Sequence, residues 1–528
     1  MTNHRLDFDP NQLSQKGLDL LNQGNFQESL EIFKKLNYHL PNNPDLLNLI
    51  GFASLQLESF DEALDAYENS LSINANQLEV LFNKAIVNDK LDNKKQALSD
   101  YDEVLKLDPN NADVCINKAL IYEDLRDYEL SLLELNKALK LNPNNFQAIS
   151  NRAKIYEYLQ KFHEAEIDLN LALKLEPNNP YAYINKGNFL KKQNKLSESK
   201  EYLYKALDLN PDLDSANYNL ALIFLYEKNF SDGWQKYESR YHLTGQPNLT
   251  KYIPKLESFN NNQKVLIWAD QGIGDQVFYG SILQSIDSKI DVTVLIDPRL
   301  ISIFKRSFPH IKFIDHFHPS NKEMFTHQLS IISLGGFFRS HVSSFNKLSG
   351  FFLKTNEAND LSIKSKINNN GKLICGLSWR SLNKKSGHKK SLELESLLPI
   401  LRMKNIHFVD IQYDDTSDEI KKFNERYGIN IQTLNGLDKF NDIDGVISLI
   451  KCCDFVVSVG NATAHFAGSI AKKTYLILPY GMDAVWYWHN DEQSTWYPTV
   501  EIFRQKNIND WRAPINEITK KVEKDFFK

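Results

Sequence analysis

The first half of the chain repeats one pattern of apolar and polar positions every 34 residues. Small residues recur at this step, and an apolar, mostly aromatic, residue lies three positions before each of them. The small series is Ser29, Ala63, Ala97, Ser131, Ala165, Ser199 and Gly233. The apolar series is Phe26, Phe60, Lys94, Tyr128, Phe162, Leu196 and Phe230, with Lys94 as the exception. A fixed period of this length predicts stacked helical hairpins, each built from one repeat.

Two further series keep the same phase. One consists of small residues: Gly17, Gly51, Ala85, Ala119, Ala153, Gly187 and Ala221. The other is Pro41, Ala75, Pro109, Pro143, Pro177 and Pro211, in which only Ala75 departs. Small residues belong where two helices cross closely. A proline after a short Asn-rich turn ends the second helix of each hairpin.

Together these series resemble tetratricopeptide repeats (TPR), in about seven units over residues 10–243. Such a solenoid offers a long concave surface on which a protein partner binds. The alternative is a spacer or an oligomerisation device. The sequence favours the protein partner and does not identify it.

The period changes from about residue 263. Short apolar segments with β-forming composition now alternate with helical patterns, which predicts a parallel α/β sheet. The predicted strands are 264–269, 291–297, 371–379, 406–412, 454–460 and 473–479. We expect linkers at 244–262 and at the polar segment 355–371. They delimit two α/β halves, 263–354 and 372–515, and residues 516–528 form a C-terminal helix or tail.

Composition narrows the class of protein. The net charge of −5, with 42% hydrophobic and 24% charged residues, indicates globular domains and gives no sign of nucleic-acid binding. The four cysteines form no CxxC pair, so neither a disulfide framework nor a zinc site is indicated. No signal peptide and no membrane span are apparent, so we expect a cytoplasmic protein.

The motifs of the second half resemble the family 9, heptosyltransferase-like glycosyltransferases, in their bacterial branch fused to TPR repeats. The segments that carry the resemblance are Trp268–Asp275, Gly376–Trp379, Ser458–Gly468, Leu478–Pro479, Trp496–Pro498 and Phe503–Gln505. The resemblance implies two Rossmann-type halves in the GT-B arrangement and a nucleotide-sugar donor as substrate. It implies no cofactor and no metal.

The first candidate site is the loop that contains Gln271, Gly272, Gly274 and Asp275, between a predicted strand and a predicted helix. Ligands of α/β proteins bind at this edge of the sheet. The glycines let a substrate approach the backbone, and Asp275 can accept the proton of an acceptor hydroxyl. In the resembled family the Asp at this place is the candidate catalytic base. The alternative for Asp275 is a helix N-cap, and the two roles are compatible.

The second candidate site is the basic loop after the strand at 371–379. Arg380, Lys389 and Lys390 are its best candidates for neutralising a leaving diphosphate without a metal. The resemblance matches its basic residue to Lys389 or Lys390. For Lys384 and Lys385 we favour a solvated loop.

The third candidate site is the start of a helix at Asn461, Ala462 and Thr463, whose free N–H groups can bind phosphate. His465 follows in the first turn, where it is placed to meet the ribose or phosphate of the donor. A lone helical histidine is more often structural, but the resemblance places this one in the family's most recognisable motif. Many relatives carry Asp where this chain has Gly460, so a carboxylate role there is excluded.

We therefore predict an inverting, metal-independent glycosyltransferase whose protein or glycan acceptor is recognised partly by the TPR arm. The alternatives are a TPR scaffold with a degenerate transferase-like domain and an O-GlcNAc-transferase-like protein glycosyltransferase. The aromatic segments Trp486–Trp488 and Trp496–Tyr497 are more typical of core than of a sugar site.

Overall fold

The computed structural model describes residues 9–243, 251–269, 271–345, 351–383, 387–483 and 485–527. The chain divides into two compact units, Met1–Lys186 and Gly187–Lys528, and the boundary falls within α11 (Pro180–Lys192). In these ranges no helix combines the length and the apolar character that are needed to cross a bilayer.

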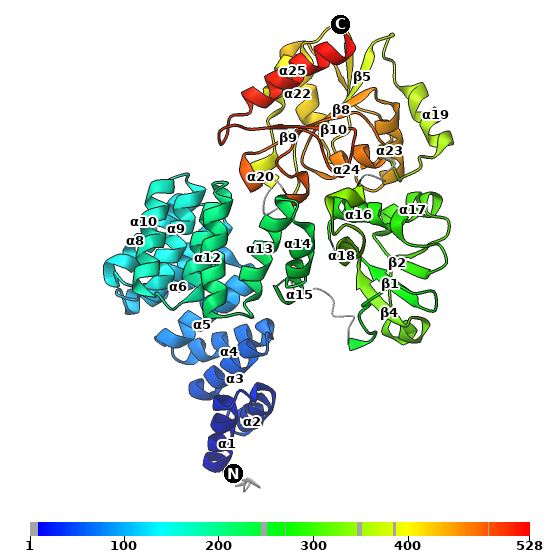
Figure 1. Ribbon diagram of the computed structural model, residues 1–528. Helices are drawn as coiled ribbons and strands as arrows, with labels where there is room; N and C mark the ends of the chain where they lie inside the picture. Colours follow the sequence, from blue (N-terminus) through cyan, green and yellow to red (C-terminus); the bar gives the residue numbers. More distant parts are fainter. Residues whose placement is uncertain are drawn as a thin grey trace. The chain divides into compact units, whose positions relative to one another are not determined.

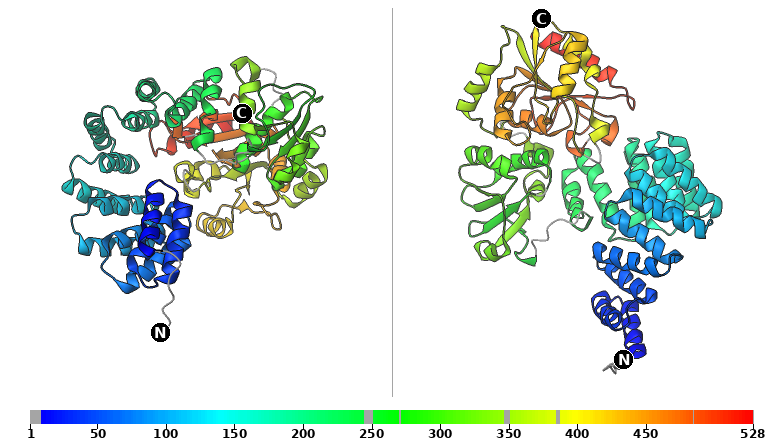
Figure 2. Two further views of the ribbon diagram at one scale, coloured as in Figure 1. Left: turned by 90° about the horizontal axis from the view of Figure 1, so that it is seen from below. Right: turned by 180° about the vertical axis from the view of Figure 1, so that it is seen from behind.

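Residues 9–243 form consecutive helices that pair as hairpins (Figures 1 and 2). The pairs are α1 (Pro10–Asn22) and α2 (Phe26–His39), α3 (Pro44–Gln56) and α4 (Phe60–Ile73), α5 (Leu78–Lys90) and α6 (Lys94–Leu107), α7 (Ala112–Asp124) and α8 (Tyr128–Leu141), α9 (Phe146–Tyr158) and α10 (Phe162–Leu175), α11 and α12 (Leu196–Leu209), and α13 (Asp214–Tyr226) and α14 (Phe230–Tyr237). A short helix, α15 (Arg240–Leu243), follows them. The predicted helical repeat is confirmed.

The small residues lie where the two helices of a hairpin cross. A Cβ added to Gly51 would meet the ring of Tyr67 at 2.5 Å, and one added to Gly17 would meet Phe33 at 2.7 Å. Ser29 donates a hydrogen bond from its hydroxyl to the Gly17 carbonyl at 2.9 Å. The two small series therefore permit the close approach that the sequence predicts.

The turn inside each hairpin uses a left-handed residue. At the 34-residue step these are Gly24, Glu58, Asp92, Arg126, Gln160, Asn194 and Lys228, with φ between 56° and 78°. The second helix of every pair begins at a member of the apolar series. At the exceptional Lys94, ion pairs to Asp89 (2.7 Å) and to Asp124 of the next repeat (2.9 Å) take the place of an aromatic contact.

The last hairpin packs into the α/β part of the second unit. Trp234 of α14 donates a hydrogen bond from Nε1 to the Arg339 carbonyl at 2.9 Å. Its ring also packs edge-on against Trp486. Phe230 lies in the same core, against Phe345. Helices α13 and α14 thus share a core with the α/β part, although their sequence continues the repeat.

The first sheet has four parallel strands in the order β3-β2-β1-β4. The strands are β1 (Lys264–Trp268), β2 (Asp291–Leu295), β3 (Lys312–Ile314) and β4 (His327–Ser330), and the α-helices of this half are α16 (Ile273–Gly280), α17 (Ile301–Ser307) and α18 (Leu334–Phe338). The short strands β3 and β4 have no counterpart among the predicted strands.

The second sheet has six parallel strands in the order β10-β9-β8-β5-β6-β7. They are β5 (Leu373–Ser378), β6 (Ile406–Asp410), β7 (Ile431–Gln432), β8 (Phe455–Val459), β9 (Thr474–Leu478) and β10 (Val500–Arg504). The helices are α19 (Glu357–Lys366), α20 (Gly387–Lys390), α21 (Leu398–Leu401), α22 (Ser417–Tyr427), α23 (Ile443–Cys452), α24 (Ala462–Ser469) and α25 (Arg512–Phe526). Alternate strand residues face α21, α22 and α25 on one side and α23 and α24 on the other.

All six predicted strands are present, and the sheets are parallel as expected. The predicted linkers carry more structure than their polar composition indicated. Asn356 caps α19 within the segment 355–371, and Ile363 of this helix is buried. In the segment 244–262, Leu256 donates its N–H to the Gln328 carbonyl beside β4. The C-terminal helix begins at Arg512 and packs on the second sheet.

Candidate functional site

Each sheet has one point at which the chain reverses its direction of winding. In the first sheet β1 lies between β2 and β4, and in the second sheet β5 lies between β6 and β8. The carboxyl ends of strands at such a switch point are the usual ligand-binding place of an open α/β sheet. The three predicted site segments follow β1, β5 and β8, so all three lie at these two switch points.

The loop after β1 starts α16, and its N-cap is Gly272. Asp275 lies in the first turn of the helix and is not its cap, so the N-cap alternative for Asp275 is wrong. Gln276 fixes this loop from the helix side, because its Nε2 donates to the Gln271 carbonyl at 2.8 Å. Its Oε1 accepts the N–H of Asp297 at 2.9 Å, which ties the loop to the end of β2.

Gly274 brings the two halves into contact. A Cβ on Gly274 would lie 3.0 Å from the Cα of Ala462 and 3.3 Å from Cδ2 of His465. The absence of a side chain therefore lets α16 pack on α24. The sequence predicted that this glycine lets a substrate approach the backbone. In the structure the space beside it is filled by α24, the helix that follows β8.

Asp275 is joined to His465 by a tyrosine. The Tyr487 hydroxyl donates to Asp275 Oδ1 at 3.1 Å and is 3.1 Å from His465 Nε2. The other ring nitrogen of His465, Nδ1, is 3.2 Å from the Tyr497 hydroxyl. Burial lowers the pKa of His465 to about 3, so the imidazole is neutral. Burial raises the pKa of Asp275, while the hydrogen bond from Tyr487 and the charge of Lys390 oppose that rise.

His465 is therefore surrounded by aromatic side chains. It is 3% exposed, and its ring stacks on Trp488 with centroids 5.1 Å apart. These surroundings are those of a structural histidine, the alternative that the sequence analysis set aside in favour of the resemblance. Both of its nitrogens already lie within hydrogen-bonding distance of tyrosine hydroxyls.

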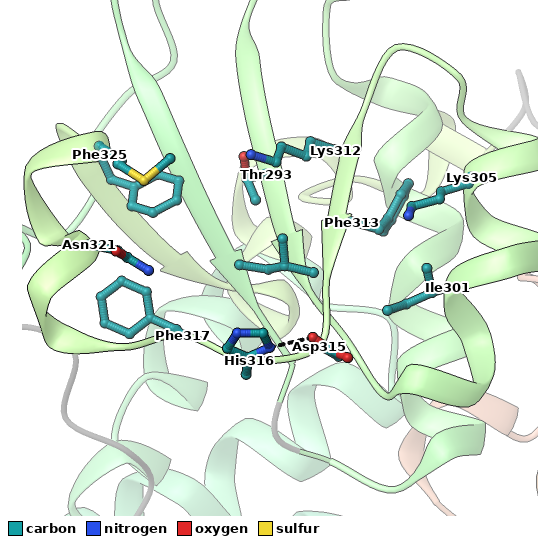
Figure 3. Close-up of a pocket in the computed structure, with 12 residues that line it drawn as sticks. Thr293, Ile301, Lys305, Lys312, Phe313, Asp315, His316, Phe317, Asn321 and Phe325 are labelled. Carbon is teal, nitrogen blue, oxygen red and sulfur yellow. Dashed lines mark hydrogen bonds and ion pairs between the residues drawn. The ribbon is translucent and has the colours of Figure 1, made fainter.

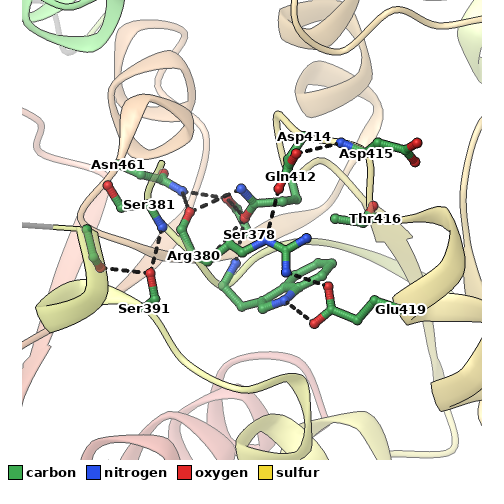
Figure 4. A network of polar contacts seen from close by, with 12 residues as sticks. Ser378, Arg380, Ser381, Ser391, Gln412, Asp414, Asp415, Thr416, Glu419 and Asn461 are labelled. Atoms are coloured by element: carbon green, nitrogen blue, oxygen red, sulfur yellow. Dashed lines mark hydrogen bonds and ion pairs between the residues drawn. The ribbon is translucent and has the colours of Figure 1, made fainter. Parts of the chain in front are cut away.

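Asn461 is the N-cap of α24 and accepts the Thr463 N–H at 3.1 Å. Its amide nitrogen donates to Ser378 Oγ at 2.7 Å and to the Arg380 carbonyl at 2.9 Å (Figure 4). Asn461 thus joins the ends of β5 and β8. Thr463 is fully buried and also contacts Ser378 Oγ, at 3.2 Å.

Arg380 forms ion pairs with two carboxylates. Its Nε is 3.1 Å from Asp414, and its Nη1 is 2.7 Å from Glu419 (Figure 4). Glu419 also accepts a hydrogen bond from the Trp379 indole at 3.1 Å. No local sequence pattern relates these two acids to Arg380, because they follow β6 and lie more than 30 residues away along the chain.

The other cations of the basic loop lie in and before α20. Lys389 and Lys390 are partly buried at its end. Lys390 is close enough to Asp275 and His465 for its charge to lower the pKa of both groups. Lys384 and Lys385 lie outside the described residues.

Gly460 lies at the end of β8 in a filled space. A Cβ there would be 2.9 Å from Cδ2 of Leu478 and 3.8 Å from Nε1 of Trp488. Leu478 therefore occupies part of the room that an acidic side chain would need. Trp488 Nε1 is buried and has no hydrogen-bond partner among the described residues.

The aromatic segments belong to the core, as predicted. Trp486, Trp488, Trp496 and Tyr497 are at most 3% exposed. Sequence reasoning assigned no site role to Tyr487, which touches both Asp275 and His465. Its place within an aromatic run was the available signal, but that signal indicates core more often than function.

A separate pocket of about 300 Å³ lies at the end of β3. Phe317, Phe325 and Asn321 approach it from one side, and Ile301 and Lys305 of α17 from the other (Figure 3). None of the predicted site residues lines it.

Comparison with known proteins supports the repeats. The model of the tetratricopeptide repeat matches residues 112–145, 146–179 and 180–213, and that of the coatomer epsilon subunit matches 11–124. Protein FlbA of Caulobacter vibrioides is 24% identical over 331 residues, which are 58% of this chain and 54% of FlbA. The chain thus spans about half the length of this curated relative.

Two solved structures that resemble the chain have TM-scores below 0.5. A tetratricopeptide repeat protein from Parabacteroides merdae is 19% identical, with a TM-score of 0.42 over 46% of this chain and 96% of that one. MamA from Desulfovibrio magneticus is 21% identical, with a TM-score of 0.31 over 33% and 98%. The match of the family model identifies residues 112–213 as tetratricopeptide repeats, and the same helix pair continues on both sides of them.

Proposed function

We propose that this protein is an inverting, metal-independent glycosyltransferase with a GT-B-like pair of α/β halves, similar to family 9. It transfers a sugar from a nucleotide-sugar donor to an acceptor. The observation that carries the proposal is the meeting of the two switch points at Gly274 and Ala462, which brings Asp275 near Lys390. A carboxylate from one sheet and a cation from the other are the groups needed for attack and departure.

Asp275 serves as general base on the acceptor side. Partial burial raises the pKa of its carboxyl, which makes it a better proton acceptor than a solvated aspartate. Attack of the acceptor hydroxyl on the anomeric carbon transfers the hydroxyl proton to Asp275. The bond to the nucleotide diphosphate breaks, and the sugar configuration inverts.

The donor side uses Lys389, Lys390 and the first turn of α24. The positive end of the helix dipole of α24 favours phosphate at this first turn. The Thr463 N–H is already bonded to the Asn461 side chain, so we assign this role to Ala462. Arg380 shapes this side through its ion pairs with Asp414 and Glu419. We assign the diphosphate to the lysines because the charge of Lys390 acts on both Asp275 and His465, where the two switch points meet.

The TPR solenoid recruits a protein partner, which we take to be the acceptor or its carrier. Helical repeats supply an extended surface to other polypeptides. An acceptor bound there is held at high effective concentration near the transferase domain.

The test combines binding and transfer. Thermal shift with UDP, GDP, ADP and their sugars, in the presence of EDTA, identifies the donor, because a ligand of the native state raises the melting temperature. Asp275→Asn should bind that donor as the wild type does and turn over about 100-fold more slowly. Lys390→Ala should weaken donor binding by roughly 1–3 kcal/mol. Asp315→Asn removes an exposed carboxylate at the end of β3 and should change neither quantity.

The second candidate is a protein-binding scaffold without catalysis. Arg380 is paired with two acids, and His465 has tyrosines at both nitrogens. These contacts would hold an α/β domain together without any ligand. Absence of donor binding throughout the panel, together with a bound protein partner, would favour this candidate.

A further inference from the structure

The contacts of Asp275 allow the donor and acceptor of each hydrogen bond around it to be assigned. An ionised carboxylate only accepts, so the Tyr487 O–H must donate to Asp275 Oδ1. The Tyr487 oxygen can then only accept from His465 Nε2. A neutral imidazole has one N–H, so its Nδ1 accepts the Tyr497 O–H.

The two oxygens of Asp275 therefore have different surroundings. Oδ1 is the atom that Tyr487 holds. Oδ2 lies 3.8 Å from the position of a Cβ on Gly272, and among the described residues, apart from Gly272 and its chain neighbours, no other atom lies within 4 Å of that position. Gly272 is exposed and Asp275 is partly buried.

On the basis of the proposed function, we propose that Tyr487 is a positioning residue that holds Oδ1 of Asp275 and leaves Oδ2 to receive the acceptor hydroxyl in the space beside Gly272. His465, as the Nε2–H tautomer, holds Tyr487 in turn. His465 thus acts on the acceptor side of the site, through Tyr487, and not on the donor phosphates.

The groups that face Asp275 bear on its titration. They come from several elements of the second unit: Tyr218 of α13, Tyr237 of α14, Tyr279 of α16, Lys390 of α20, and Tyr487 and Tyr497. Burial raises the pKa of each of these tyrosines, so their hydroxyls stay neutral near pH 7. Lys390 is the cation of the set, and Tyr487 is the tyrosine whose hydroxyl donates to the carboxylate.

The first test needs no substrate. In full-length protein labelled with ¹⁵N-histidine and ¹³Cγ-aspartate, His465 should appear as the Nε2–H tautomer at pH 7. Tyr487→Phe should raise the pKa of Asp275 by about one to two units, the loss of one hydrogen bond to a charged group. Tyr279→Phe is the matched control, because this buried hydroxyl lies near Asp275 and pairs with Tyr237 instead. An Nδ1–H tautomer, or an unchanged Asp275 titration in Tyr487→Phe, would overturn the proposal.

The second test uses the transfer reaction. In Tyr487→Phe the acid limb of the pH profile of kcat/KM should move upward by the same one to two units. Gly272→Ala should lower kcat/KM for the acceptor about tenfold or more without changing donor affinity. Gly272 has φ −59° and ψ 159°, a conformation open to any residue, so the added methyl group tests the space and not the backbone.

The two tests separate the two proposals. If no donor binds and no transfer occurs while the tautomer and the titration behave as stated, the hydrogen-bond chain stands and the proposed function fails. If transfer occurs with an unshifted acid limb in Tyr487→Phe, or with full acceptor activity in Gly272→Ala, the assignment of the two oxygens is wrong.

Discussion

Trp234 lies directly on Gly335, so closely that a Cβ on Gly335 would be 2.2 Å from Cζ2 of the indole. Trp234 belongs to the last repeat hairpin and Gly335 to α18, next to the first sheet. The indole of the repeat helix α14 therefore lies directly on the backbone of α18. This contact makes α14 part of the α/β core.

Gly335→Ala should destabilise the second unit by about 1–3 kcal/mol, since the buried ring has to move. Gly336→Ala is the matched control in the same helix, because its nearest neighbour, Cβ of Trp234, would be 3.7 Å away. That is an ordinary contact, so a change within about 0.5 kcal/mol is expected. Urea unfolding followed by tryptophan fluorescence measures both variants. If both variants lost the same free energy of unfolding, the close contact between Trp234 and Gly335 would not be the cause of the destabilisation.

The hairpin turns offer a paired test of backbone conformation. Gly24 has φ +78° and no neighbouring atom within 4 Å of an added Cβ, so Gly24→Ala should cost about 1 kcal/mol from the backbone alone. Glu58 has φ +56° at the equivalent turn, so Glu58→Gly should stabilise by up to about 1 kcal/mol. Circular dichroism during urea unfolding gives both values. Destabilisation by Glu58→Gly would show that its side chain matters more than its φ.

Acidification should weaken the second unit through two buried histidines. The pKa values of His465 and His489 are lowered to about 3 and about 4, against an ordinary value of 6.5. Between those values the unfolded chain binds more protons, so stability is full above pH 6.5 and falls as the pH drops. At pH 5 the loss from His465 is roughly 2 kcal/mol. Asp275, whose folded pKa is raised, offsets part of it at lower pH.

The measurement is the urea midpoint of the second unit at pH 7 and at pH 5. His465→Gln keeps a polar side chain without a titrating ring, so the difference between the two midpoints should shrink in this variant. An identical difference in His465→Gln and in the wild type would exclude His465 as its source.

Gly460→Asp tests whether the acidic residue of many relatives fits this chain. Leu478 would be 2.9 Å from the new Cβ, and the buried Trp488 Nε1 is the donor nearest to it. We expect a loss of about 2–4 kcal/mol, from both crowding and the burial of a charge. Gly460→Ala introduces only the crowding, so it should cost less. If Gly460→Asp were as stable as the wild type, Trp488 and its neighbours would accommodate the carboxylate.

The repeats could be predicted in detail because their physics is local. Gly17, Gly51 and Gly187 each meet a partner 16 positions later, as Gly51 meets Tyr67. The second helices α2, α4, α6, α8, α10 and α12 each end two residues before the proline position of their repeat. The same spacing recurs every 34 residues, so the sequence shows the same contact several times. The longer strands were also predictable, because each is a short, apolar, buried segment between turns. The positions after β1, β5 and β8 followed from the strands.

Tertiary structure alone decided which residues meet across the second unit. Tyr487 contacts Asp275 over 212 positions of sequence, and Trp234 bonds to Arg339 over 105. No period or local pattern relates such pairs. Strands as short as β3 and β7 form because their neighbours offer N–H and C=O partners, not because of their own composition. The sequence by itself determined the repeat, the longer strands and the residue types at the sheet edges. Packing determined which of those residues their neighbours hold, as Tyr487 holds Asp275.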